Sequence, residues 1–328
     1  MSPAGSGKGA APAVVAFGGG HGLAASLSAL RRVTGRLTAV VTVADDGGSS
    51  GRLRAELGVL PPGDLRMALA ALCGDDEWGS TWSRVVQHRF ASVGELHGHA
   101  VGNLLIVALW ELLGDTVGGL DWMGRLLGAQ GRVLPMASVP LDITAEVVGL
   151  DPGAPDAVST VAGQVAIATT QGHVVEIGLS PAYPPACPEA VAAVRAADWV
   201  VLGPGSWFTS VLPHLLVPDL ARALIETPAR RLVTLNLAAQ AGETTGFAPS
   251  TYLEVLATHA PGLRLDTVLV DADTVGDIAG LRRMAAALGA EVVVAPVSMG
   301  DGTARHDPRL LAAAYDSIFA DGRARPWR

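Results

Sequence analysis

The feature that most constrains the fold is a regular alternation of short apolar runs with longer helix-like stretches. Residues 13–17 form a continuous apolar run that stops at glycines, as a strand buried on both faces would. Residues 23–32 then place leucines on one helical face. The remaining predicted strands are 37–44, 199–202, 231–237, 267–270 and 291–297. The alternation predicts an α/β fold: a Rossmann-like, doubly wound, mostly parallel sheet with helices on both faces.

The middle of the chain changes character over residues 133–180. Short alternating stretches at 147–150, 165–168 and 174–177 are separated by Gly, Pro and Asp. Such alternation is typical of strands with one exposed face, so we expect a small antiparallel insertion here. The whole chain, residues 1–328, is expected to form a single nucleotide-binding domain with its core at about 13–315. The tails, 1–12 and 320–328, are expected to be frayed.

Composition excludes several classes of protein. The chain is 49% hydrophobic, yet its long apolar stretch at 101–113 is interrupted by Asn103 and Glu111 and is shorter than a membrane span. The first dozen residues have no apolar core of the kind a secretory signal needs, so we expect a cytoplasmic protein without a membrane span. A net charge of −8 argues against nucleic acid as a partner. Lys8 is the only lysine, so an anion site deeper in the chain must use arginine, backbone N–H groups or a metal.

Polar and glycine-rich segments follow four of the predicted strands, where ligands bind in doubly wound sheets. The first segment links strand to helix, and its backbone N–H groups could hold a phosphate. Leu23 occupies the place of the third glycine in a dinucleotide fingerprint, so the pattern is incomplete. Residues 5–9 resemble a P-loop but lack a Ser or Thr after Lys8 and follow no strand. The candidate residues of the first segment are Gly18, Gly19, Gly20, His21 and Gly22.

The second segment carries adjacent carboxylates, which could hold a divalent metal, a ribose hydroxyl or a proton. Glycines and serines behind the acids could form an anion nest, and an arginine supplies positive charge. Its candidates are Asp45, Asp46, Gly47, Gly48, Ser49, Ser50 and Arg52. Further along, Asp64 and Arg66 begin a predicted helix, where Asp64 could equally be a helix N-cap or a ligand-binding group.

Three histidines at 88, 97 and 99 invite a zinc interpretation, but no acidic or cysteine partner stands at a typical offset. His99 and Asn103 are better explained as lining a pocket before a buried helix. Asn236 ends a buried strand, where its amide needs a partner, and a ligand is one candidate. The last candidates lie in polar loops after apolar strands: Gly203, Gly205, Ser206, Gln240, Glu243 and Thr244.

Taken together, these motifs resemble the gluconeogenesis factor family (YvcK-like), within the superfamily of 2-phospho-lactate transferase (CofD). The resemblance covers residues 13–315 and is carried by GGGHGL, VTVADDGGSSGRLR, LPPGDLR, QHRF, GHAVGNLL, ADWVVLGPGSWFTSVLPHLL and NLAAQAGET. His21, His88, Ala100, Val101 and Ala241 depart from the family's common pattern, and none of them removes a glycine or carboxylate of the motifs.

The resemblance implies a bacterial protein that binds a UDP-sugar, UDP-N-acetylglucosamine, and links carbon metabolism to cell-wall synthesis and cell shape. It implies no established catalysis, and unidentified regulatory proteins as partners. The transferase branch of the superfamily implies an alternative, in which Asp45 and Asp64 hold Mg²⁺. An NAD(P)-dependent oxidoreductase is a third alternative, because glycines and then acids also hold a dinucleotide's ribose. The sequence leaves turnover, base specificity and a homo-oligomeric state open.

Overall fold

A computed structural model describes residues 11–240 and 242–324, and the P-loop-like residues 5–9 lie outside the described part. Seven strands form one sheet in the order β10-β9-β8-β7-β1-β2-β3, and every neighbouring pair is parallel. These strands are β1 (Ala13–Gly18), β2 (Arg36–Val41), β3 (Arg132–Pro135), β7 (Trp199–Leu202), β8 (Arg230–Thr234), β9 (Thr267–Asp271) and β10 (Glu291–Ala295). The predicted doubly wound sheet is confirmed.

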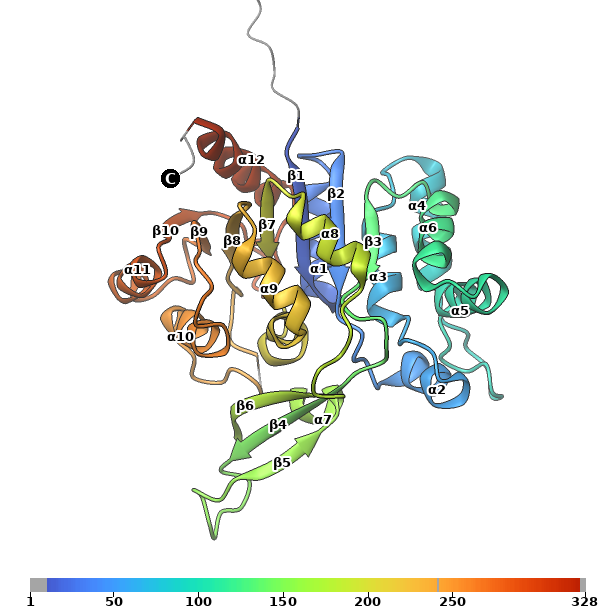
Figure 1. The fold of residues 1–328 in the computed structure, drawn as a ribbon, viewed down its shortest axis with the longest axis horizontal. Helices are drawn as coiled ribbons and strands as arrows, with labels where there is room; N and C mark the ends of the chain where they lie inside the picture. Colours follow the sequence, from blue (N-terminus) through green and yellow to red (C-terminus); the bar gives the residue numbers. More distant parts are fainter. Residues whose placement is uncertain (1–10, 241, 325–328) are drawn as a thin grey trace, which may run out of the picture.

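Helices cover both faces of this sheet (Figure 1). On one face α1 packs against α3 and α12, and on the other α8 packs against α9. The helices are α1 (Gly20–Leu30), α2 (Gly48–Leu57), α3 (Gly63–Ala71), α4 (Glu77–Gln87), α5 (Val101–Leu113), α6 (Thr116–Leu127), α7 (Gln164–Ala168), α8 (Pro188–Arg195), α9 (Pro218–Glu226), α10 (Pro249–His259), α11 (Ile278–Ala287) and α12 (Pro308–Ala324). A π-helical turn η1 (Trp207–Val211) and a 3₁₀ turn η2 (Leu212–Leu216) follow β7.

The central strands are apolar because both of their faces are covered. All four residues of β7 are buried, as are Val14 to Gly18 of β1. A parallel strand between two helical layers has no solvent-facing side, which explains the continuous apolar runs in the sequence.

A second sheet has three antiparallel strands, β4 (Asp142–Val148), β5 (Ser159–Ala162) and β6 (His173–Ser180), in the order β5-β4-β6. It projects beyond the carboxyl ends of the main strands (Figure 1). The predicted antiparallel insertion is therefore confirmed, with two differences. Residues 132–135 belong to the main sheet as β3, and residues 165–168, expected to alternate as a strand, lie in helix α7.

Among residues 11–240 and 242–324, no single helix is both long and apolar enough to cross a membrane. The segments Trp207–Leu216 and Pro218–Glu226 meet the criterion only jointly and are bent by 83°.

Candidate functional site

Two glycine-rich loops meet where the strand order reverses, between β1 and β7. A Cβ atom built on Gly22 would lie 2.6 Å from Gly205 Cα and even closer to the carbonyl oxygen of Pro204. Gly205 itself has φ +136° and faces Gly22 Cα. The loops after β1 and β7 are thus in direct backbone contact, and a side chain at residue 22 would separate them. This point of the sheet is where doubly wound folds bind ligands.

Gly20 differs from its neighbours because the space around it is open. Its φ is +55°, which favours glycine, and a Cβ built on it would meet no atom within 4 Å. Helix α1 begins here without a side-chain cap and without an acidic residue in its first turn. The N–H of Gly20 hydrogen-bonds the Asp64 carboxylate and so opposes the rise of its pKa, while the positive dipole end and the following N–H groups of the first turn suit a phosphate. His21, beside it, is exposed.

Asp45 and Asp64 come together from different loops, each fitted beside a glycine. A Cβ built on Gly63 would lie 2.6 Å from Asp45 Oδ2, and one built on Gly19 would lie 2.5 Å from Asp64 Oδ2. Asp64 Oδ2 is buried and has no hydrogen-bond partner among the described residues. Burial, followed by the like charge of Asp45, raises the pKa of Asp64 to about 7. The two carboxylates are therefore poised to share a proton or a cation.

The N-cap interpretation of Asp64 is wrong. The N-cap of α3 is Pro62, and Asp64 lies inside the first turn of that helix. A carboxylate there faces the loop after β1 and leaves the helix end without a side-chain cap.

The carboxylate pair can hold a metal only with help from a ligand. Within the part of the chain that the structure describes, no group of three or more His, Cys, Asp or Glu side chains could hold a metal ion. Mg²⁺ commonly binds one or two carboxylates and completes its shell with water and phosphate oxygens. Asp45 and Asp64, with the unpartnered Oδ2 of Asp64, fit that pattern.

Asp46 has a structural contact, and its ligand contact stays a prediction. Its Oδ1 accepts a hydrogen bond from the backbone N–H of Val165 at 3.2 Å, and its Oδ2 lies against Gly163. The exposed carboxylate thus joins the loop after β2 to the start of α7 in the small sheet. Asp45 in turn accepts a bond of 3.0 Å from the N–H of Gly47, which shapes the turn toward Gly48.

Ser49 is the centre of a buried polar network that connects α2 to α5. Its Oγ hydrogen-bonds His99 Nδ1 at 3.0 Å and accepts from Asn103 Nδ2 at 3.0 Å. Asn103 Oδ1 accepts from Arg66 Nε at 2.9 Å. Burial and the charges of Arg52 and Arg89 lower the pKa of His99, which keeps the ring neutral. Predicted residues from three separate motifs therefore meet in one network, and none of these contacts was visible from spacing.

The Arg52 guanidinium donates hydrogen bonds to backbone carbonyl groups. Its Nη1 donates to Glu95 O at 3.1 Å and its Nη2 to His97 O at 2.6 Å, so the arginine holds the segment before α5. Ser50 is buried close to the space that a side chain on Gly63 would fill.

Polar groups in the loops after β7 and β8 form hydrogen bonds with each other. Asn236 accepts from Gly205 N at 2.7 Å and donates to Gly205 O at 2.8 Å. Ser206 Oγ donates to the Glu243 carboxylate, at 2.7 Å to Oε2, and also contacts Thr209 Oγ1. Gly205 thus supplies a partner for each polar atom of the Asn236 amide, while a ligand contact of Asn236 stays a prediction. Glu243 lies in this internal network as well, and burial raises the pKa of its carboxyl group.

The polar groups in the rest of the loop after β8 are only partly hydrogen-bonded. Thr244 Oγ1 accepts from Gln240 N at 2.8 Å and from Tyr252 Oη at 3.0 Å. Gln240 Oε1 is buried without a hydrogen-bond partner among the described residues. Sequence reasoning missed two contributors to the site, Thr209 and Arg89. Arg89 stands in the QHRF motif, but only the structure shows that its charge lies near Arg66.

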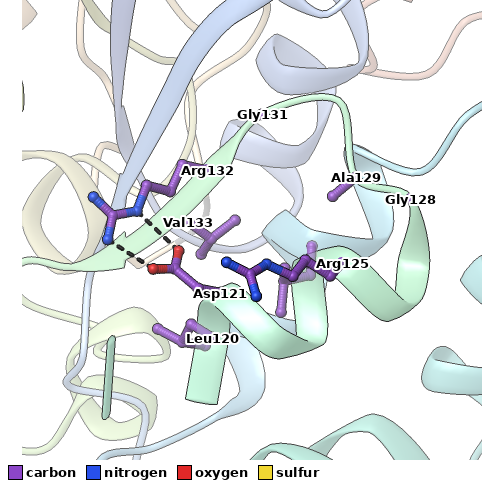
Figure 2. Close-up of a pocket in the computed structure, with 10 residues that line it drawn as sticks. Leu120, Asp121, Arg125, Gly128, Ala129, Gly131, Arg132 and Val133 are labelled. Atoms are coloured by element: carbon purple, nitrogen blue, oxygen red, sulfur yellow. Dashed lines mark hydrogen bonds and ion pairs between the residues drawn. The ribbon is translucent and has the colours of Figure 1, made fainter. Parts of the chain in front are cut away.

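Two cavities lie elsewhere. One of about 350 Å³ is bounded by α6 and the start of β3, where Arg132 pairs with Asp121 through two hydrogen bonds of 2.8 Å (Figure 2). Another of about 600 Å³ is lined by residues of α8 and by Asp219. Neither contains a residue predicted for the ligand site, so the strand-end cluster remains the candidate.

The model of the 2-phospho-L-lactate transferase CofD family matches residues 14–295. The chain belongs to this family. It is 56% identical over 310 residues to a Mycobacterium tuberculosis protein named "Putative gluconeogenesis factor", covering 94% of this chain and 90% of that one. It is 36% identical over 266 residues to the gluconeogenesis factor of Bacillus subtilis, covering 81% and 80%. A crystal structure of a UPF0052 family member from Bacillus halodurans superposes with a TM-score of 0.81 at 33% identity, covering 92% of this chain and 98% of that one. The expected family and fold are confirmed.

Proposed function

We propose that this protein is a non-catalytic regulator that binds a nucleotide sugar, UDP-N-acetylglucosamine, and links carbon metabolism to cell-wall synthesis and cell shape. One observation carries the proposal: the open N-terminus of α1 at Gly20, beside the loop contact between Gly22 and Gly205. A diphosphate placed there meets the N–H groups of the first turn of α1 beyond Gly20, whose own N–H interacts with Asp64, and does so without needing lysine. Relatives named gluconeogenesis factor support the regulatory role.

Thermal shift with three ligands tests the choice of ligand. A ligand that binds only the folded state raises the melting temperature by mass action. UDP-N-acetylglucosamine should raise it most, GDP less and NAD⁺ least. A larger shift with NAD⁺ than with the UDP-sugar contradicts the proposal.

Two substitutions of Gly20 that differ only in charge test where the phosphate binds. Asn and Asp have nearly the same shape and both tolerate a left-handed backbone, so Gly20→Asn and Gly20→Asp place similar side chains in the open space. Only the aspartate repels a phosphate at the helix N-terminus. We expect the UDP-sugar to bind Gly20→Asp at least about tenfold more weakly than Gly20→Asn, since charged hydrogen bonds are worth about 1.5–3 kcal/mol. Equal affinities in calorimetry would move the phosphate elsewhere.

A transferase is the second candidate, favoured by the pairing of Asp45 with Asp64. In that case the two carboxylates would hold Mg²⁺, which would neutralise charge on a transferred phosphoryl-type group. Calorimetry with and without Mg²⁺ separates the candidates. For the regulator, we expect UDP-sugar affinity to change less than about threefold, because recognition by N–H groups needs no cation.

The matched variants are Asp45→Asn and Asp46→Asn, because Asp46 faces Val165 and not Asp64. Consumption of a nucleotide-linked donor by wild type and by Asp46→Asn, but not by Asp45→Asn, would establish the transferase in place of the regulator.

A further inference from the structure

The cavity beside the start of β3 has the size of a site for a small molecule. It holds about 350 Å³ between α6, the loop after that helix and the first residues of β3 (Figure 2). Ligand pockets in proteins span about 300–1,000 Å³, so this cavity suits a molecule smaller than a nucleotide sugar. It lies at the amino end of the parallel strands, because β3 begins at Arg132, whereas the glycine-rich loops follow the carboxyl ends of β1 and β7. A ligand in this cavity would therefore be a second ligand.

The floor of this cavity is apolar. Leu69 of α3, Leu120 of α6 and Val133 of β3 line it, and all three are buried. The loop between α6 and β3 adds only small residues to the lining, Gly128, Ala129 and Gly131. The part of a ligand that lies on this floor is best matched by hydrocarbon, which gains from leaving water.

Gly124 keeps the cavity open, and no other feature of α6 requires a glycine at this position. Its φ is not left-handed, and a Cβ built on it would meet its nearest neighbours at 3.9 Å, an ordinary contact. The helix also contains Gly118 and Gly119, but there a Cβ would lie 2.5 Å from Asp115 Oδ2 and 2.6 Å from Trp110 Cδ1. Glycine inside a helix is destabilising relative to alanine. The space that Gly124 leaves is thus maintained at a cost to the helix.

The rim of the cavity is charged, with one positive charge in excess. Asp121 and Arg125 are four residues apart on α6, where opposite charges can pair. Asp121 pairs with Arg132 instead, through two hydrogen bonds of 2.8 Å. No ion pair within 4.0 Å in the described part of the chain includes Arg125. Its exposed guanidinium lies over the ring of Trp122, with Cζ 4.9 Å from the ring centroid.

We propose that this cavity binds a small organic acid. The hydrocarbon part of the acid lies on the floor formed by Leu69, Leu120 and Val133, and its carboxylate lies at the rim beside Arg125. A guanidinium presents paired N–H donors that match the two oxygens of a carboxylate. An inorganic anion would gain nothing from the apolar floor, and a neutral hydrocarbon would gain nothing from Arg125. This inference does not rest on the identity of the nucleotide sugar.

Saturation-transfer NMR with sodium butyrate as the probe tests the site at constant ionic strength. The second probe is 1-butanol, which has a hydrocarbon chain of the same length and no charge. Gly124→Leu fills the cavity, and Arg125→Gln removes the charge. Ala192→Leu is the matched control for added bulk, because exposed Ala192 lines the other cavity, on α8. Arg84→Gln is the matched control for charge, because Arg84 is exposed on α4.

We expect wild type to bind butyrate with millimolar affinity and 1-butanol more weakly. Gly124→Leu should lose both signals while its melting temperature stays at or above that of wild type. Arg125→Gln should bind butyrate about threefold to fivefold more weakly and 1-butanol unchanged, because a pair at an exposed arginine contributes modestly. Ala192→Leu and Arg84→Gln should bind both probes as wild type does.

Three results would overturn the proposal. The first is no butyrate signal with wild type at millimolar concentrations. The second is wild-type binding of butyrate to folded Gly124→Leu, and a loss in Ala192→Leu alone would assign the probe to the cavity on α8. The third is an unchanged ratio of butyrate to 1-butanol affinity in Arg125→Gln, which would remove the carboxylate from the site. Failure of UDP-N-acetylglucosamine to bind would leave the butyrate result unchanged.

Discussion

Replacing Gly22 by alanine tests the contact between the two glycine-rich loops, because two physical effects oppose each other there. Gly22 is the third residue of α1 and has no left-handed φ, so alanine fits its backbone. Helix propensity alone would then stabilise the protein by about 0.5–1 kcal/mol. The new methyl group, however, would lie 2.6 Å from Gly205 Cα and from the carbonyl carbon of Pro204.

The loop after β7 must move back by more than about 0.8 Å to reach an ordinary contact distance of 3.4 Å, because the carbonyl oxygen of Pro204 lies nearer still. Overpacking costs about 1–3 kcal/mol, and the upper end applies because the obstructing atoms belong to the backbone. After subtraction of the propensity gain, Gly22→Ala should lose about 2–2.5 kcal/mol. An unfolding entropy of about 2.1 cal/mol/K per residue gives about 0.7 kcal/mol/K for 328 residues. The melting temperature should therefore fall by about 3–3.5 °C.

Gly124→Ala is the matched control for the helix effect. Gly124 lies inside α6, and a Cβ built on it would meet its nearest neighbours at 3.9 Å, an ordinary contact. Propensity should act alone there and raise the melting temperature by about 1 °C. Differential scanning calorimetry shows whether each variant has a higher or a lower melting temperature than wild type. A rise in Gly22→Ala equal to that in Gly124→Ala would refute the loop contact and the switch-point geometry built on it.

Two further predictions concern packing around the site. Burial lowers the pKa of His214 to about 4 from an ordinary 6.5, so the unfolded chain binds a proton more readily. Stability from this residue is therefore present above about pH 6.5, and about 3 kcal/mol of it should be lost by pH 4; urea unfolding of His214→Gln should show a correspondingly flatter pH dependence. Asp46→Ala should lose the hydrogen bond from Val165 N and lower the free energy of opening of the small sheet by about 1 kcal/mol. Hydrogen exchange of residues 142–180 should then show about fivefold less protection. Asp46→Asn keeps the acceptor and should behave as wild type does. Equal pH profiles in the first case, or unchanged protection in Asp46→Ala, would contradict these assignments.

The main sheet was predictable because burial on both faces leaves a clear trace in the sequence. A strand such as β1 between two helical layers must be apolar throughout, and its end is marked by glycines. Asp64 follows no strand, so strand ends alone could not place it beside Asp45; the two were paired only through the transferase alternative that the family resemblance implies. The predicted strand at 165–168 failed because a contact 119 positions away decides it: Asp46 accepts from Val165 N where α7 begins. A local pattern of alternating apolar residues contains no information about such a distant partner.

Asn236 shows why site residues are harder to predict than strands. A buried amide at a strand end needs a partner, but the sequence does not say whether that partner is a ligand or another loop. Gly205 supplies both bonds, so the residue positions a loop. Arg66 was a predicted site residue, but only the folded chain reveals its bonds to Asn103 and Gln87 and its place near the carboxylates of Asp64 and Asp45.

The two sides of the candidate site therefore have different tasks. On the β7 and β8 side, Ser206 and Glu243 satisfy each other and need no ligand. On the β1 and α3 side, the Oδ2 atom of Asp64 is buried and has no hydrogen-bond partner among the described residues. A buried polar group without a partner costs about 1–3 kcal/mol, so a ligand gains most by contacting this atom. Substitutions on the first side should then act on stability and binding together, while those on the second should weaken binding with little loss of stability.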